Sequence, residues 1–513
     1  MYSNKIRHTR SQKGFHSLLL AVTLLFCFGA SSWAELANSI SQHGITWTFK
    51  EKHETGQFAN GDHWVVGPVK IIGIDPPSIE RVGTTSLSGF VDGGDDAQPR
   101  TMNGSMANPV PPVEGVPGAQ GFDSEMYLWH PINGRYPNKQ SKYDSTLNVA
   151  LGVTAESALE LPADSSLVST ISHEQGGRPQ LKSAAILTVL GAVPPDKGAT
   201  IFRPPYVGTS KPLISTKGLR KDLLPQLPLV HPMPDLDDVI AQFDRPWLDH
   251  FAHVGDGTQY TSPSENMPNY GREYSQAVGK ASLMLMLNEK ELLSSNGQTK
   301  DDLLIRFVQL GIDLYYVTEN GGYWWGVGGL NHGRKWPIIF AGLMLDNESM
   351  RTIGSRSKEM PYWGFAEDAQ TKYIEESDVA MSHSSAWKPD DRGGELVPYE
   401  TSDIGMPEWN VAGYAPGHDG ARAANKPFGH LYREINGMSY PGIILAALLL
   451  NQKGAWNHDA LFDYTDRYVP WAIEQKASEW NEAQKSIYVY GGDFQRAMWE
   501  AYRGDKDDKP NKK

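Results

Sequence analysis

The sequence predicts a multidomain α+β protein, in which a β-sandwich-like N-terminal domain precedes an (α/α) toroid, or incomplete barrel, of helical hairpins. Two observations support this prediction. Residues 45–234 contain short alternating runs of apolar and polar residues between turn signals, which is typical of strands. After Pro234 the apolar residues adopt the spacing of amphipathic helices. Several such helices joined by long polar loops favour an antiparallel helical toroid.

The first 34 residues are expected to be a signal peptide. Four cations precede an apolar stretch at 18–30, and Ser32-Trp33-Ala34 has the small-x-small form of a cleavage site. The apolar stretch is too short to act as a membrane anchor. We therefore expect a secreted or periplasmic protein that begins near residue 35 and is not inserted in a membrane.

Charge and cysteine content narrow the possible partners. The whole chain has a formal charge of −13, and loss of the four signal-peptide cations, with no acid, leaves −17 over 479 residues. That sign argues against nucleic acid and anionic membranes as partners, although a local cationic cleft can still bind an acidic polysaccharide. The only cysteine, Cys27, lies in the signal peptide, so the mature chain has neither disulfides nor thiol catalysis. The oligomeric state stays open.

The chain divides into three parts after the signal peptide. We expect a β-rich domain at 35–235, a helical catalytic domain at 236–503 and a charged, disordered tail at 504–513. The best strand patterns lie at 45–49, 64–72 and 184–190, and the best helix patterns at 274–287, 303–314, 338–345 and 443–450. The long Gly/Pro loops of the β-rich domain are suited to forming one wall of a cleft.

Residues 323–336, YWWGVGGLNHGRKW, are the most informative stretch of the chain. Aromatic faces stack on sugar rings, and glycines let the backbone approach a ligand closely. An imidazole beside cations can take a proton while the charge holds an anionic substrate. The predicted substrate-binding residues here are Tyr323, Trp324, Trp325, Arg334, Lys335 and Trp336, and the segment at 265–274 adds Tyr270, Arg272 and Tyr274.

Four polar segments lie beside the predicted helices, at 265–274, 331–336, 390–400 and 430–436. Asn, Arg, Tyr and His together outnumber the carboxylates in them. The chain has no GxSxG, HExxH or phosphate-binding-loop motif. This inventory favours β-elimination on a uronic acid, in which an amide or cation neutralises the C5 carboxylate, a base removes the C5 proton and an acid protonates O4.

Two of these segments resemble a known family. An Asn-His pair stands before a tryptophan and a helix, and Arg392 stands seven positions before Tyr399. This is similar to the helical-toroid polysaccharide lyases that cleave alginate or glucuronate polymers, over about residues 240–500. The resemblance implies that Asn269 or Asn331 binds the substrate carboxylate. It further implies that His332 is a base or carboxylate neutraliser and that Tyr399 is the base, the acid or both, supported by Arg392.

Two other functions stay open at this point. A glycoside hydrolase needs two carboxylates flanking a cleft, and the candidates are Asp390, Asp391, Glu395, Glu408 and Asp419. A non-catalytic carbohydrate-binding protein would use the same aromatic residues without an acid–base set. The spacing of the histidines is not that of a zinc site. We expect no cofactor and leave a structural calcium ion open.

Overall fold

The computed structural model describes most of the chain after residue 34. The described residues are 35–81, 100–111, 120–124, 126, 143–174, 181–250, 264–268, 270–288, 292, 294–324, 329–358, 364–385, 396–409, 422–423, 436–475 and 481–504. The predicted signal peptide and the tail after Gly504 lie outside them.

Strands dominate the first half. The described strands there are β1 (Glu35–Gln42), β2 (Ile45–Gln57), β3 (His63–Val66), β4 (Val69–Asp75), β5 (Ile79–Arg81), β6 (Arg100–Met102), β7 (Ser105–Ala107), β8 (Leu159–Leu161), β9 (Ser165–Ser172), β10 (Leu181–Leu190), β11 (Ile201–Phe202) and β12 (Ile214–Ser215). Eight of them form one mixed sheet in the order β7-β9-β10-β3-β2-β4-β8, with β1 paired to β2. Among the pairs of described strands in this sheet, only β10–β3 is parallel. The strand patterns at 45–49 and 184–190 fall within β2 and β10, so these local predictions are confirmed. The pattern at 64–72 is divided at Gly67-Pro68 into β3 and β4.

The predicted β-sandwich is wrong, because the strands form one large curled sheet rather than two stacked ones. Shifts of register interrupt the pairing of β1 with β2, of β2 with β4 and of β9 with β10. Such irregularities bend strands and increase their twist. The curl encloses its own apolar core, which includes Trp47, Ile71 and Leu187. A single sheet can therefore bury an inner face without a second sheet.

Helices dominate the second half. The described ones are α1 (Leu236–Phe243), α2 (Gly271–Met284), α3 (Lys300–Glu319), α4 (Lys335–Met344), α5 (Glu348–Arg351), α6 (Ala366–Ala369), α7 (Glu376–Ser382), α9 (Pro441–Leu449), α10 (Lys453–Trp456), α11 (Asp459–Gln475), α12 (Glu482–Tyr490) and α13 (Asp493–Tyr502). The short strands β13 (Thr371–Tyr373), β14 (Leu396–Val397), β15 (Pro407–Trp409) and β16 (Arg422–Ala423) lie among them. The four predicted helix patterns fall in α2, α3, α4 and α9, and these predictions are also confirmed.

The predicted (α/α) toroid is wrong as well. The described helices do not form a ring of hairpins. Helices α5, α6 and α10 have four residues each, and the pairs β13–β15 and β14–β16 interrupt the helical order. Helix α2 packs on the distant α9, where a Cβ on Gly279 would come within 3.0 Å of the Gly442 backbone. The spacing of apolar residues predicts that a segment is helical, but it does not show which other helix that segment packs against. The arrangement of the helices in a toroid could therefore not be deduced from the spacing.

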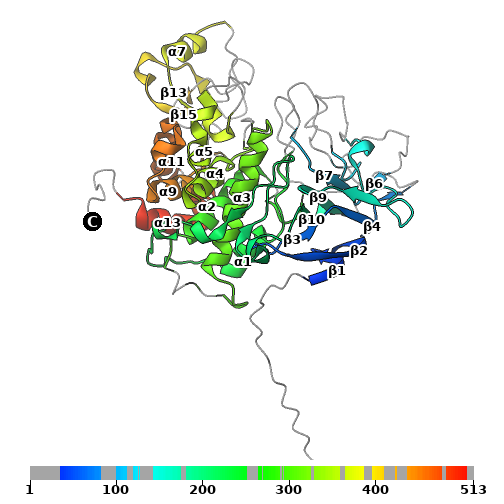
Figure 1. The fold of residues 1–513 in the computed structure, drawn as a ribbon. Coiled ribbons are helices and arrows are strands. Elements are labelled where there is room, and N and C mark those ends of the chain that lie inside the picture. Colours follow the sequence, from blue (N-terminus) through cyan, green and yellow to red (C-terminus); the bar gives the residue numbers. More distant parts are fainter. Residues whose placement is uncertain are drawn as a thin grey trace, which may run out of the picture.

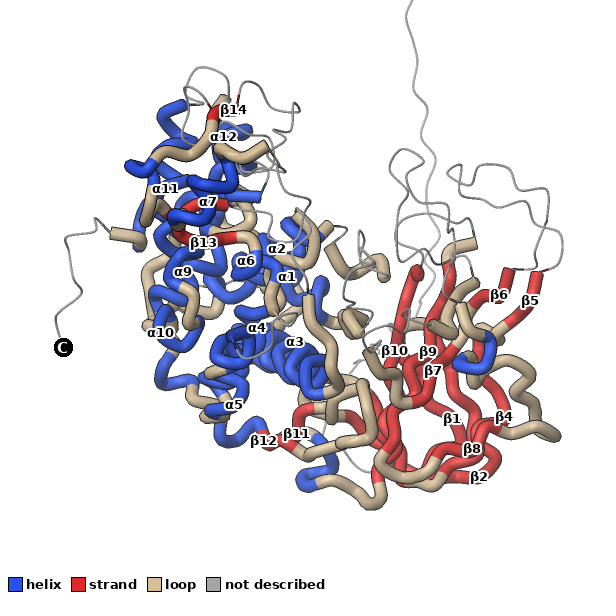
Figure 2. The backbone as a smooth tube through the Cα atoms, turned by 90° about the horizontal axis from the view of Figure 1, so that it is seen from above, coloured by secondary structure: helices blue, strands red, loops and turns tan. Residues whose placement is uncertain are grey.

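The two halves lie side by side and share a core (Figures 1 and 2). Successive residues of β10 point to opposite faces of the sheet. Leu187 faces the inside of the curl, whereas Ile186 belongs to the cluster that contains the helices. The Arg203 guanidinium, which is almost completely buried, joins the halves by donating to Asp62 (2.6 Å) and to Asp313 of α3. None of the helices in the described part of the chain has the length and hydropathy needed to cross a membrane.

Candidate functional site

Three segments distant in the sequence meet beside the start of α2. A Cβ on Gly271, the first residue of α2, would come within 2.7 Å of the Gly329 carbonyl oxygen. A Cβ on Gly329 would in turn come within 2.7 Å of both the Asn436 Oδ1 atom and the Tyr270 ring. The turn at 329–334, the start of α2 and the turn before α9 are therefore in direct contact, and only glycine fits at both positions.

These turns, together with α6 and the residue that ends it, build a polar group that we call the His332 cluster. It consists of Asn331, His332, Glu367, Gln370, Asn436, Ser439 and Tyr440. Asn331 adopts a left-handed conformation with φ of 63°, which asparagine tolerates better than most residues. All members are buried, whereas the adjoining Tyr270 and Arg272 are partly exposed. The Arg272 guanidinium lies 5.2 Å from the Tyr270 ring centroid, so a cation stands at the exposed side of the cluster.

His332 is held through both ring nitrogens. Its Nδ1 atom lies 2.9 Å from Ser439 Oγ, and its Nε2 atom lies 2.5 Å from Gln370 Oε1. Burial lowers the pKa of the imidazole to about 4, so the ring is neutral at physiological pH. A histidine with both nitrogens engaged can orient Ser439 and Gln370, but it has no nitrogen left to meet a substrate in this arrangement.

The two cations after His332 are also committed to protein partners. Arg334 donates to Asp249 at 2.8 Å and 3.3 Å, and its guanidinium lies 3.7 Å from the Tyr274 ring centroid. Lys335 donates to Asp368 and to the Trp456 carbonyl oxygen (2.6 Å). Both cations and Tyr274 are buried. In this structure they hold the site together rather than present charge to a polymer.

Several polar atoms near His332 lack a hydrogen bond. Within the described residues, both carboxylate oxygens of Glu367, both amide atoms of Asn436 and the hydroxyl of Tyr440 are buried without a partner. Each such group costs about 1–3 kcal/mol. Native proteins keep few of them, so their concentration around one histidine marks a candidate functional site.

Burial also shifts the acid–base behaviour of these groups. It raises the pKa of the Glu367 carboxyl to about 7, with the charge of Asp368 adding to the effect and Lys335 and Arg334 opposing it. Burial, and after it the charge of Glu367, raises the pKa of the Tyr440 phenol well above its usual value. Titrating groups with perturbed pKa values are typical of functional sites.

The predicted aromatic residues lie in the core. Trp324 stacks on Phe365 with 5.9 Å between ring centroids, and Trp336 stacks on Trp456 at 6.2 Å. Both tryptophans are completely buried, and Tyr323 is only 8% exposed. Stacking on a sugar would require the present neighbours to leave. Trp325 lies outside the described residues.

The tyrosine of the predicted Arg–Tyr pair lies in the described part of the chain. Tyr399 is buried next to the end of α7, where its backbone N–H donates to Ser382 Oγ (3.0 Å) and its carbonyl oxygen lies 2.9 Å from His383 Nε2. Arg392 and Asn269 lie outside the described residues, so the roles predicted for them stay predictions. Of the hydrolase candidates only Glu408 is described, and it is completely buried.

Four cluster members, Glu367, Gln370, Ser439 and Tyr440, were not predicted from the sequence. Gln370 and Ser439 lie 38 and 107 residues from His332, and nothing in the sequence pairs them with it. Asn436 is the last residue of the fourth polar segment. The composition of that segment indicated a possible site, but it indicated no role for Asn436. Tyr440 directly precedes Pro441 and an apolar helix, a position that attracts little notice in a sequence.

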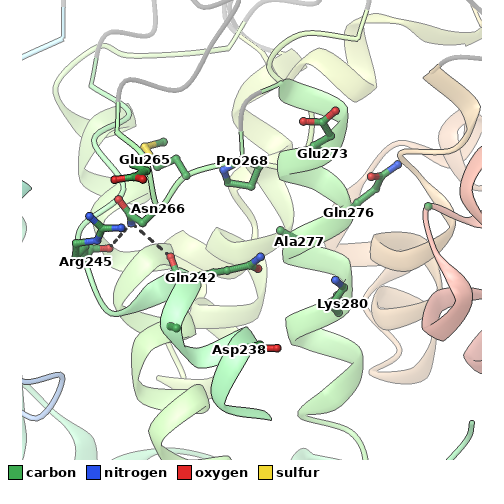
Figure 3. A pocket seen from close by; sticks show the side chains of 13 residues that line it. Asp238, Gln242, Arg245, Glu265, Asn266, Pro268, Glu273, Gln276, Ala277 and Lys280 are labelled. Atoms are coloured by element: carbon green, nitrogen blue, oxygen red, sulfur yellow. Dashed lines mark hydrogen bonds between the residues drawn. The ribbon is translucent and has the colours of Figure 1, made fainter. Parts of the chain in front are cut away.

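A separate open pocket lies between α1 and α2 (Figure 3). Its volume is about 400 Å³, and it is lined by charged and amide side chains that include Asp238, Gln242, Glu273, Gln276 and Lys280. Burial lowers the pKa of Lys280. None of the described residues that line this pocket is aromatic, so they provide no surface on which a sugar ring could stack.

No metal site or known relative identifies the protein further. Within the part of the chain that the structure describes, no group of three or more His, Cys, Asp or Glu side chains is placed to hold a metal ion. No family model, curated protein or solved structure matches the chain. The function must therefore be argued from the site itself.

Proposed function

We propose that the chain is a lyase that cleaves a uronic-acid-containing polysaccharide, of the alginate or glucuronan type, by β-elimination. The observation that carries the proposal is the set of buried, unpartnered polar groups around the Asn331-His332 pair, the pair on which the resemblance to polysaccharide lyases rests. These groups are an amide, a phenol and a carboxyl, which are suited to binding a carboxylate and moving protons.

The reaction needs a proton carrier near the sugar. The C5 proton passes to a base, the C4–O4 bond breaks with its electrons on O4, a C4=C5 double bond forms, and O4 takes up a proton. We assign Tyr440 as the proton carrier because its hydroxyl is buried without a hydrogen bond from the described residues and its ring centroid lies 5.3 Å from that of His332. His332 positions the turn through Ser439, which donates in turn to the Asn436 carbonyl oxygen.

The substrate carboxylate needs a partner that offsets its charge, because this acidifies the C5 proton. We assign this role to Asn436, whose amide has no partner among the residues that the structure describes, together with Arg272 at the exposed side. Tyr270 lies between them, against Gly329. Helix α2 starts here without a side-chain cap, so its positive end adds to the attraction for an anion.

The test is incubation with alginate, polyglucuronate and other polyuronates, followed by ultraviolet absorbance of the unsaturated product. We expect absorbance to rise with the wild-type protein. The isosteric Asn436→Asp variant, which places a charge beside the substrate carboxylate, should raise KM and lower kcat. New reducing ends without absorbance would instead indicate a hydrolase, for which Asp238 and Glu273 of the α1–α2 pocket become the candidates. No product from any polyuronate would overturn the proposal.

A further inference from the structure

The polar pocket between α1 and α2 contains two side chains that no described residue engages (Figure 3). Lys280 of α2 is partly buried, and its ammonium has no hydrogen bond or ion pair within the described part of the chain. Burial lowers the pKa of Lys280, because the ammonium loses part of its hydration. Gln242 extends from α1 towards α2, and its Oε1 atom is buried without a hydrogen bond from the described residues. Both groups are therefore available to a ligand.

Helix α2 separates this pocket from the His332 cluster. Glu273, Gln276 and Lys280 line the pocket, and their spacing of three and four residues places them on one face of the helix. Ser275 faces the other way, since its hydroxyl donates to the Ser439 carbonyl oxygen (2.5 Å). At 3.6 residues per turn, Ser275 and Lys280 are about 140° apart around the helix axis. The pocket is thus a site separate from the one to which we assign the lyase reaction.

The charges around the pocket match a ligand that carries both signs. The described lining contains both acids and bases, which are Asp238, Glu265, Glu273, Arg245 and Lys280. Arg245 donates to the Lys182 carbonyl oxygen (2.7 Å), whereas Lys280 is left for a carboxylate of the ligand. A simple anion would be repelled by the acids, and a simple cation would leave the Lys280 ammonium unpaired. The absence of aromatic side chains from the described lining argues against a sugar.

We propose that the pocket binds a free α-amino acid, whose carboxylate pairs with Lys280 and whose ammonium group lies among the acids. The amide of Gln242 has both a donor and an acceptor, so it can bond to either end of the amino acid. Acids outnumber bases in the described lining, so an amino acid with a net positive charge, such as L-lysine, suits the pocket best. This inference does not depend on the proposed lyase function.

The test is isothermal titration calorimetry of the full-length protein with L-lysine, L-glutamine and L-glutamate. We expect L-lysine to bind with a Kd of about 1 mM or tighter, and the affinity to fall in the order of the three probes because their net charge falls. Lys280→Met and Gln242→Leu should each weaken L-lysine binding by about tenfold or more, since each removes a hydrogen bond to a charged group. Lys221→Met, at an exposed lysine that pairs with Asp301, is the matched control and should bind as the wild type does.

A change to the ligand checks the position assigned to its carboxylate. L-lysinamide lacks that carboxylate, so the wild type should bind it about tenfold more weakly than L-lysine, and Lys280→Met should not weaken it further. Urea unfolding shows whether the variants fold, and if Lys280→Met does not, Gln242→Leu and L-lysinamide decide the question.

Four results overturn the proposal. They are L-lysine binding weaker than about 1 mM, unchanged L-lysine affinity in either folded variant, equal affinity for L-lysinamide, and tighter binding of L-glutamate than of L-lysine. Glucuronate is titrated alongside, and a higher affinity for it than for L-lysine also overturns the proposal, because the pocket would then be a site for an acidic sugar.

Discussion

Gly329 lies so close to Asn436 that a methyl group in place of its hydrogen would come within 2.7 Å of the Asn436 Oδ1 atom. Asn436 is completely buried. The same methyl group would press on the Tyr270 ring. This contact sets the distance between the amide that we assign to the substrate carboxylate and the exposed start of α2.

Gly329→Ala should therefore impair both stability and turnover. Overpacking of a tight interior costs about 1–3 kcal/mol, and a displacement of about 1 Å at a catalytic group costs on the order of 10²-fold in rate. Urea unfolding and kcat/KM on a polyuronate measure the two effects. Gly454→Ala is the control, because a Cβ there meets nothing within 4 Å. Wild-type turnover in Gly329→Ala would show that the contact does not position the site.

Tyr440→Phe and Tyr399→Phe separate the two candidate proton carriers. We expect Tyr440→Phe to lose about 10²- to 10⁴-fold in kcat. Its unfolding midpoint should stay the same or rise, because the change removes a buried hydroxyl that has no partner in the described part of the chain. Tyr399→Phe should leave kcat within about 10-fold, a change in barrier below about 1.4 kcal/mol. The opposite ranking would return the role to Tyr399, as the resemblance to polysaccharide lyases implied.

The features predicted correctly from the sequence are those with a local signal. The apolar spacing of residues 303–314 and 443–450 lies within single helices, α3 and α9, and the pattern at 184–190 lies within β10. Fold class depends instead on pairings between distant segments. Strand β10 pairs in parallel with β3, so that Leu187 stands opposite His63. Nothing near either residue in the sequence indicates whether the strands form one curled sheet or two sheets stacked face to face.

The same limit applies to the candidate site. The Asn331-His332 pair is contiguous, and its unusual composition drew attention to it. The partners that fix the ring, Gln370 and Ser439, come from separate segments. The burial of Trp336 and Lys335 was not foreseen either, because an aromatic and cationic stretch has the same composition whether it faces a ligand or packs inside a core.

Arg203 should be the residue on which the joining of the two halves depends most. Its guanidinium binds Asp62 beside the curled sheet and Asp313 in α3, and its side chain is 1% exposed. Arg203→Ala leaves two buried carboxylates without a cation, which should cost about 3–5 kcal/mol. Urea unfolding measures the loss. Arg220→Ala, in an exposed pair with Asp222, should leave the midpoint unchanged. Equal effects from both variants would show that the buried network does not hold the halves together.

The stability of the protein should depend on pH through two opposing groups in the His332 cluster. The folded pKa of His332, about 4, lies below the ordinary value of 6.5. The folded protein therefore binds fewer protons at His332 than the unfolded chain does. The stability that neutral His332 contributes is lost as pH falls from 6.5 towards 4. The folded pKa of Glu367, about 7, lies above the ordinary value of 4.5. The stability that protonated Glu367 contributes is present below pH 4.5 and is lost as pH rises through 7.

Between pH 4.5 and 6.5 these two slopes nearly cancel, since each group contributes about 1.36 kcal/mol per pH unit with opposite sign. Glu367→Gln removes one of them, so its free energy of unfolding should rise with pH more steeply than that of the wild type. His332→Gln removes the other and should show the reverse trend, on top of a constant loss from the unpartnered Gln370 and Ser439.

Urea unfolding at half-unit steps of pH measures the differences between these free energies of unfolding. His250, whose pKa burial lowers to about 3, is present in all three proteins, so its effect drops out. Parallel curves for the wild type and Glu367→Gln would show that Glu367 keeps an ordinary pKa in the folded protein.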